Sequence, residues 1–78
     1  MADFFLYRPA AGSRPHEDVP GTFATLDEAE HAARGLVRHK GWAEVMIYRD
    51  SAPIGPVAYV RRDALDRIWT DVMDGAVG

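Results

Sequence analysis

The sequence contains no cysteine. It therefore cannot form a disulfide framework, a zinc site with thiolate ligands or an active site with a cysteine nucleophile. It also lacks an apolar run of about 20 residues, the length that a membrane-spanning helix needs. The first residues do not form the basic segment with which a signal peptide starts. We therefore expect a cytoplasmic protein.

The composition is that of an ordinary folded domain. Hydrophobic residues make up 47% and charged residues 27% of the 78 positions, which argues against wholesale disorder. A chain of this length forms one domain, which we expect to span residues 1–78. The formal net charge of −3 argues mildly against a non-specific nucleic-acid binder.

Three short segments have the composition of strands: residues 4–8, 42–49 and 57–61. Residues 9–21 contain three prolines and two glycines, which predicts a long loop. Residues 25–40 form the first predicted helix, because Thr25 and Glu28 fit a capping box and Gly41 suits the position after the last turn.

A second helix is predicted from residue 63 to residue 75. Asp63 is its expected N-cap, Gly75 its end, and the intervening apolar residues recur at helical spacing. The predicted fold is therefore α+β with the order β-α-β-β-α. It is a two-layer arrangement of a three-stranded mixed sheet with two helices on one face, and the first crossover makes strands one and two parallel.

Two helices on one side leave the other sheet face bare. The alternation along residues 42–49 places Trp42, Glu44, Met46 and Tyr48 on that face, and Tyr7 and Tyr59 are further candidates. Exposed aromatic patches usually mark interfaces. Three explanations remain open: the 9–21 loop or a strand at 22–24 covers the face, a second copy binds it, or a foreign partner does.

Catalytic signatures are missing. Glu28 and His31 have the spacing of a helical metal-ligand pair, but no second such motif accompanies them. Neither serine lies in a nucleophile elbow, and no glycine-rich phosphate loop precedes a helix. We therefore expect no enzyme activity, no catalytic residue, no metal and no cofactor.

The order of the predicted elements is similar to that of the ferredoxin-like RNA recognition motif, truncated before its last strand. Residues 55–60 and 4–7 resemble the third-strand and first-strand signatures of that family, which stacks bases on aromatic side chains. The basic residue that should precede the glycine is Ile54 here, and the overall charge is acidic. Direct binding of RNA or DNA is therefore the less favoured alternative.

In size, acidity and lack of chemistry the chain resembles the small inhibitors carried by phages and mobile elements, of which anti-CRISPR proteins are an example. The resemblance implies a protein that occludes a surface of a host effector complex, with carboxylates opposite a basic groove. The predicted partner-binding residues are therefore Trp42, Glu44, Met46, Tyr48, Asp66, Asp71 and Asp74. A self-associating housekeeping module is the alternative, with a homodimer formed through the bare face.

Overall fold

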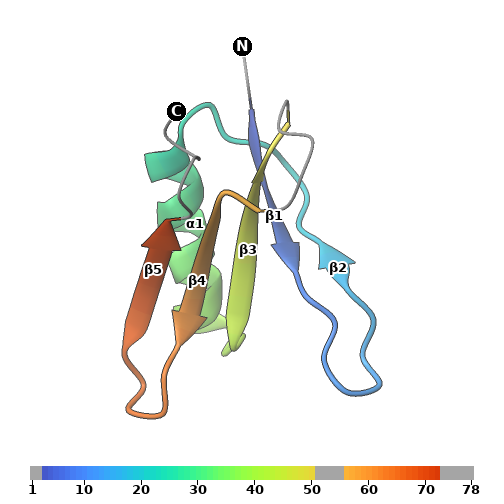
Figure 1. Ribbon diagram of the computed structural model, residues 1–78, viewed down its shortest axis with the longest axis vertical. Helices are drawn as coiled ribbons and strands as arrows, with labels where there is room; N and C mark the ends of the chain where they lie inside the picture. Colours follow the sequence, from blue (N-terminus) through green and yellow to red (C-terminus); the bar gives the residue numbers. More distant parts are fainter. Residues whose placement is uncertain (1–2, 51–55, 73–78) are drawn as a thin grey trace.

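The computed structural model describes residues 3–50 and 56–72 and shows a five-stranded sheet with one helix against it. The elements follow the chain as β1 (Phe4–Arg8), β2 (Glu17–Asp18), α1 (Leu26–His39), β3 (Glu44–Arg49), β4 (Ala58–Arg62) and β5 (Ile68–Val72). The strand order is β2-β1-β3-β4-β5, and every neighbouring pair is antiparallel (Figure 1).

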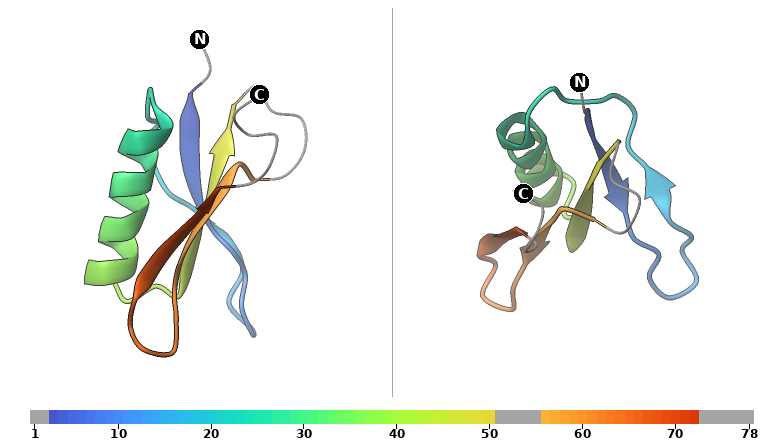
Figure 2. Two further views of the ribbon diagram at one scale, coloured as in Figure 1. Left: turned by 60° about the vertical axis from the view of Figure 1, so that its left-hand side comes forward. Right: turned by 45° about the horizontal axis from the view of Figure 1, so that its top comes forward.

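Helix α1 packs on one face of this sheet, as both views of Figure 2 show. Its buried side chains are short, since Ala29 and Ala33 are fully inaccessible to solvent. Small residues on this stripe let the helix lie close to the strands. The sheet contributes the larger apolar side chains to the core, namely Leu6, Val45, Ile47 and Val60. Within the described residues, no helix is long and apolar enough to cross a membrane.

The structure confirms the first predicted helix. The Thr25 side-chain oxygen accepts a hydrogen bond from the Glu28 backbone N–H at 3.1 Å, as an N-cap residue does. At the other end, Lys40 is the C-cap and Gly41 has a φ of +69°, a left-handed conformation that glycine adopts without steric cost.

The predicted second helix is wrong, and so is the three-stranded mixed sheet with two helices. Strand β5 occupies the middle of the predicted helix. Side chains alternate along this segment: Ile68 and Thr70 face α1, whereas Trp69 is 49% exposed on the opposite side. The apolar residues fit a helical stripe equally well, but the β-branched and aromatic side chains favour a strand.

Asp63 begins a tight hairpin turn instead of a helix. Its backbone carbonyl accepts from the Asp66 N–H at 3.1 Å, and its N–H donates to the Arg67 carbonyl at 2.9 Å. Asp66 has a φ of +62°, so the turn is a three-residue hairpin loop with one left-handed residue. Aspartate tolerates this conformation better than most residues. One oxygen of the Asp63 carboxylate, which was expected to cap a helix, accepts hydrogen bonds from the backbone of this hairpin instead.

The first crossover also differs from its prediction, because β1 and β3 are antiparallel. The reason lies inside the predicted 9–21 loop, where β2 pairs with β1 and reverses the chain before the helix begins. The pairing continues past β2, since Phe23 and Phe4 exchange two backbone hydrogen bonds of 2.8 Å. The two strands that α1 connects in parallel are thus β2 and β3, with β1 between them.

Candidate functional site

The sheet face turned away from α1 is the candidate site. The strand registers place alternate residues of each strand on this face. Within the described residues, no helix or strand covers it (Figure 2). We call this surface the open face, and its residues are Phe5, Tyr7, Asp18, Glu44, Met46, Tyr48, Tyr59, Arg61, Trp69 and Asp71.

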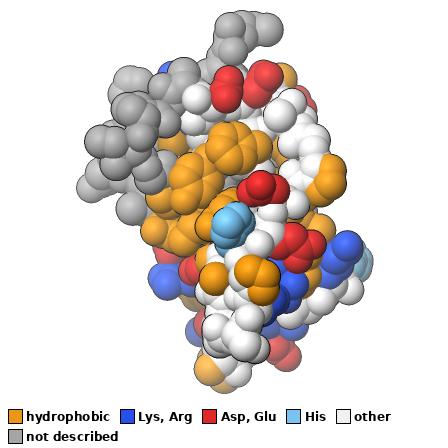
Figure 3. Space-filling view, turned by 90° about the vertical axis from the view of Figure 1, so that its right-hand side faces the viewer, with side chains coloured by type: hydrophobic (Ala, Val, Ile, Leu, Met, Phe, Trp, Pro, Cys, Tyr) orange, Lys and Arg blue, Asp and Glu red, His pale blue; other side chains and the backbone are white. Residues whose placement is uncertain are grey.

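Aromatic rings at the β1–β3 end of the open face contact one another directly. Phe5 and Tyr48 stack with ring centroids 5.4 Å apart, and Tyr7 meets Tyr48 edge-on at 5.5 Å. The His16 ring stacks on Tyr7 at 5.0 Å. Figure 3 shows the resulting patch, in which hydrophobic side chains gather beside a histidine. Mutual packing holds these rings in place, so little side-chain entropy remains to be lost when another surface covers them.

Tyr48 lies at the centre of the aromatic group. The Tyr48 hydroxyl lies 3.9 Å from the Met46 sulfur, and the side chain is half-buried. Partial burial raises the pKa of Tyr48 above its ordinary value, and the neighbouring phenols of Tyr7 and Tyr59 reinforce this increase. The phenol therefore stays neutral at physiological pH and presents an uncharged donor at the middle of an apolar patch.

The charged residues of the open face are mainly acidic. Asp18 lies opposite Tyr7 and Glu44 lies opposite Arg61 in the sheet registers. Arg61 also forms an ion pair with Asp71 at 2.8 Å. The ten open-face residues thus include three carboxylates and one guanidinium. The Arg67 guanidinium, which lies 5.4 Å from the Trp69 ring, is paired with Asp63 at 3.0 Å. Phosphate backbones require the opposite balance.

Four of the predicted partner-binding residues come together on the open face: Glu44, Met46, Tyr48 and Asp71. Trp42 does not. Its side chain is only 7% exposed and belongs to the core, beneath the Arg8 guanidinium at 4.4 Å from the ring. Trp42 precedes β3 and follows the left-handed Gly41, so the two-residue alternation of the strand does not extend to it.

The remaining two predicted residues lie elsewhere. Asp66 is in the hairpin turn, where its carboxylate is 3.6 Å from Arg62. Asp74 falls outside the described residues. The predicted helix 63–75, which contained all three aspartates, is contradicted because β5 occupies residues 68–72.

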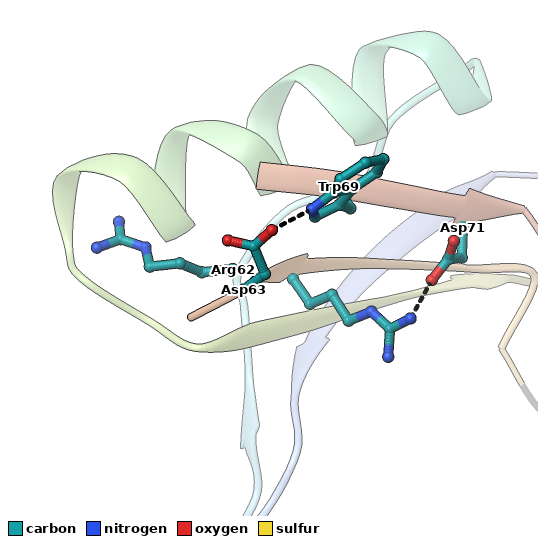
Figure 4. A pocket seen from close by; sticks show the side chains of 5 residues that line it. Arg62, Asp63, Trp69 and Asp71 are labelled. Carbon is teal, nitrogen blue, oxygen red and sulfur yellow. Dashed lines mark hydrogen bonds and ion pairs between the residues drawn. The ribbon is translucent and has the colours of Figure 1, made fainter. Parts of the chain in front are cut away.

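A shallow depression of about 320 Å³ lies at the β4–β5 end of the sheet. It is lined by Arg61, Arg62, Asp63, Trp69 and Asp71 (Figure 4). Its charged groups are already engaged: Arg61 binds Asp71, and Arg62 donates to the Val37 carbonyl at the end of the helix. We therefore treat the depression as part of the open face and not as a separate site for a charged ligand.

Asp63 organises this end of the sheet. One of its carboxylate oxygens accepts from the backbone N–H groups of Leu65 and Arg67, at 2.8 and 2.9 Å. The other accepts from the Trp69 indole N–H at 2.7 Å and from the Arg67 side chain at 3.0 Å. The Trp69 bond, followed by the Arg67 backbone bond, holds the pKa of Asp63 well below its usual range. The bond to Asp63 thus fixes the orientation of the half-exposed Trp69 ring.

Sequence reasoning did not place Phe5, Asp18, Arg61 or Trp69 on the open face. In β1, Phe5 and Tyr7 lie on one face and Leu6 on the other. Because the residues of both faces are apolar, the sequence did not indicate which face is buried. Asp18 needed recognition of β2, and Trp69 needed recognition of β5. The placement of all four depends on strand pairings between distant parts of the chain.

Among the described residues, no three histidine, aspartate or glutamate side chains gather in a group able to hold a metal ion. Comparison of the chain with protein-family models, with curated proteins and with solved structures finds no match. The function is therefore argued from the geometry of the open face.

Proposed function

We propose that this chain is a non-enzymatic protein-binding module that uses the open face to bind a partner protein. The observation that supports the proposal is the group of contacting aromatic side chains on a sheet face that no described helix or strand covers. Aromatic side chains that are rigid and partly exposed are the residues in which binding energy concentrates. We also propose that the protein acts in the cytoplasm.

The charges of the open face define the kind of partner. Its carboxylates lie at the edges of the aromatic group, with Asp18 on β2, Glu44 at the start of β3 and Asp71 on β5. A complementary surface has an apolar centre with lysine or arginine side chains around it. In its most specific form, the proposal is an inhibitor that occludes a basic surface of a host effector complex. Acidic and apolar contacts on a single face support that form.

Binding of RNA or DNA to the same face is a weaker proposal. Stacking of bases needs exposed rings, which the open face has, but it also needs cations near the phosphates. Among the described residues, Arg61 is paired with Asp71 at 2.8 Å, and Arg67 beside Trp69 is paired with Asp63 at 3.0 Å.

The test uses matched variants of the tagged full-length chain in a quantitative pull-down from lysate of the source organism. Tyr48→Thr removes the central ring of the open face while keeping a residue that favours strands. Leu65→Ser is the control, because Leu65 is 71% exposed at the hairpin tip, away from the aromatic group. Both proteins are first shown to be folded by circular dichroism, and each pull-down is performed with and without nuclease treatment of the lysate.

We expect one protein to be recovered in stoichiometric amount by the wild type and by Leu65→Ser, and at least about tenfold less of it with Tyr48→Thr. Equal recovery by all three proteins contradicts the proposal. Recovery that disappears with nuclease treatment supports the nucleic-acid alternative, and recovery of this chain alone, lost in Tyr48→Thr, supports the self-associating alternative.

A further inference from the structure

The two edges of the sheet differ in how well they are protected from pairing with another strand. The β2 edge is two residues long, both of them acidic, and prolines at positions 15 and 20 flank it. Short length, charge and proline are the devices by which proteins prevent pairing between sheet edges. Strand β5 has five residues with no proline and no lysine, and its only charged residue, Asp71, is paired with Arg61.

Among the described residues, β5 is an edge strand, and its backbone groups that do not bond to β4 lie on the outer edge. The Asp63 N–H points towards β5, since it donates to the Arg67 carbonyl at 2.9 Å. The Arg62 N–H points the other way, to the Ala43 carbonyl beside β3 at 3.0 Å. Antiparallel strands alternate in this respect, so the residues of β5 whose backbone groups face outwards are Ile68, Thr70 and Val72.

Arg34 of α1 forms hydrogen bonds at this edge. It donates to the Thr70 hydroxyl at 3.1 Å and, over a longer distance of 3.4 Å, to the Ile68 carbonyl. A carbonyl oxygen accepts two hydrogen bonds, so this contact leaves the Ile68 carbonyl able to pair with another strand. Val72, at the other end of β5, is 48% exposed.

The sequence of β5 is complementary to itself when two copies run antiparallel about Thr70. In that register Thr70 faces its own copy, Ile68 faces Val72 and Trp69 faces Asp71. Aliphatic residues thus meet on the helix side and no two like charges are directly opposite. Thr70 is also one of the residues whose N–H and carbonyl point outwards, so the central pair exchanges two backbone hydrogen bonds.

We propose that β5 pairs with β5 of a second copy of this chain, forming a two-fold dimer with a continuous ten-stranded sheet. The two-fold axis is perpendicular to the sheet, so both helices lie on one side and both open faces on the other. The contact is confined to one short strand from each chain, which makes the dimer weak and dependent on concentration. Two adjacent open faces provide bivalent binding to a partner that has two sites. The inference uses a different surface from the proposed function and does not rest on it.

The test is the self-association of the full chain, measured by sedimentation velocity from micromolar to millimolar concentration. Thr70→Pro removes the central outward N–H and leaves the hydrogen bonds to β4 in place, because proline is tolerated on edge strands. Thr70→Val is the matched control, since it keeps the N–H and the shape of the side chain and loses only the hydroxyl. We expect a dimer whose dissociation constant rises at least about tenfold in Thr70→Pro and is unchanged in Thr70→Val.

A cross-linking measurement covers the case in which Thr70→Pro fails to fold. The chain contains no cysteine, so Thr70→Cys introduces a single thiol. Two hydrogen-bonded antiparallel residues have Cα atoms about 5.5 Å apart, within the range of a disulfide. Mild oxidation should give a covalent dimer with Thr70→Cys and none with Thr22→Cys, whose residue is exposed outside β5.

Three results would overturn the inference: a monomer at millimolar concentration, a dimer that Thr70→Pro does not weaken, or equal cross-linking at positions 70 and 22. A dimer that is lost in Tyr48→Thr but kept in Thr70→Pro would place the contact on the open face instead. Loss of the dimer in Thr70→Pro with unchanged capture of a partner protein would confirm this inference and the proposed function separately.

Discussion

Replacing Trp42 with alanine distinguishes a core residue from a binding residue. The Trp42 side chain is 7% exposed and packs with the main hydrophobic core. Truncation of a buried tryptophan or phenylalanine to alanine costs about 3–5 kcal/mol. The Arg8 guanidinium at 4.4 Å from the ring contributes about 0.5–1 kcal/mol of cation–π energy, which is also lost.

This loss is large relative to the stability of the whole domain. Small domains are stable by about 5 kcal/mol, near the lower end of the usual range. We therefore expect Trp42→Ala to leave a substantial fraction of the chain unfolded at 25 °C without denaturant. Tyr48→Ala is the comparison, because its half-buried ring loses about 1–2 kcal/mol from reduced burial and stacking.

Urea unfolding followed by far-ultraviolet circular dichroism measures both variants without relying on tryptophan fluorescence. The expected order of stability is wild type, then Tyr48→Ala, then Trp42→Ala. An unfolding midpoint for Trp42→Ala equal to that of the wild type would refute the placement of Trp42 in the core. If Trp42→Ala has the urea midpoint of the wild type but no longer binds the partner, Trp42 belongs to the binding site after all.

Two further predictions concern the hairpin between β4 and β5. Asp66→Gly should raise the free energy of unfolding by up to about 1 kcal/mol, because glycine adopts the φ of +62° without strain, and a lower urea midpoint would contradict this. The second is that Asp63→Asn should destabilise the hairpin by a constant amount at neutral pH. The lowered pKa of the Asp63 carboxyl means that its contribution is fully present above the ordinary value of 3.8 and is lost only as the pH falls through the lower folded value. The urea midpoints of the wild type and of Asp63→Asn, measured from pH 7 to pH 3, test this. A difference between the two midpoints that already shrinks between pH 7 and pH 5 would contradict the prediction.

The elements that depend on neighbouring residues were predictable from the sequence. Thr25 and Glu28 mark the start of α1, and Gly41 its end, because caps are local hydrogen-bonding arrangements. The strands β1, β3 and β4 were also located to within a few residues. Their side-chain alternation correctly placed Met46 and Tyr48 on one face and Val45 on the other.

The pairings between distant segments were not predictable in the same way. The segment 63–73 contains apolar residues at helical spacing, and only the Trp-Thr-Val composition of β5 indicated a strand. Its conformation is fixed by tertiary contacts: β4 on one side, and Arg34 of the helix, which binds Thr70. Strand β2 is two charged residues in a loop rich in proline, and nothing in its own composition indicates a strand. These two errors produced the wrong sheet and the wrong direction of the crossover.

The residues of the candidate site divide in the same way, into those that a local pattern predicted and those that depend on distant pairings. Glu44, Met46 and Tyr48 come from one strand and were grouped correctly. Asp66, Asp71 and Asp74 were grouped through a predicted helix whose described residues form a hairpin turn and β5 instead. Trp42 was assigned by extending an alternation beyond the strand that produces it. A period-two pattern is informative only where the chain is extended.

The most direct test of the binding role of the open face is site-specific photo-cross-linking in cells of the source organism. A benzophenone amino acid is placed at position 48, in the aromatic group, or at position 38, an exposed site near the end of α1. We predict that irradiation links position 48 to one partner protein in high yield and that position 38 gives no such product. The same products from both positions, or none from position 48 in a folded protein, would contradict the assignment of the open face as the binding surface.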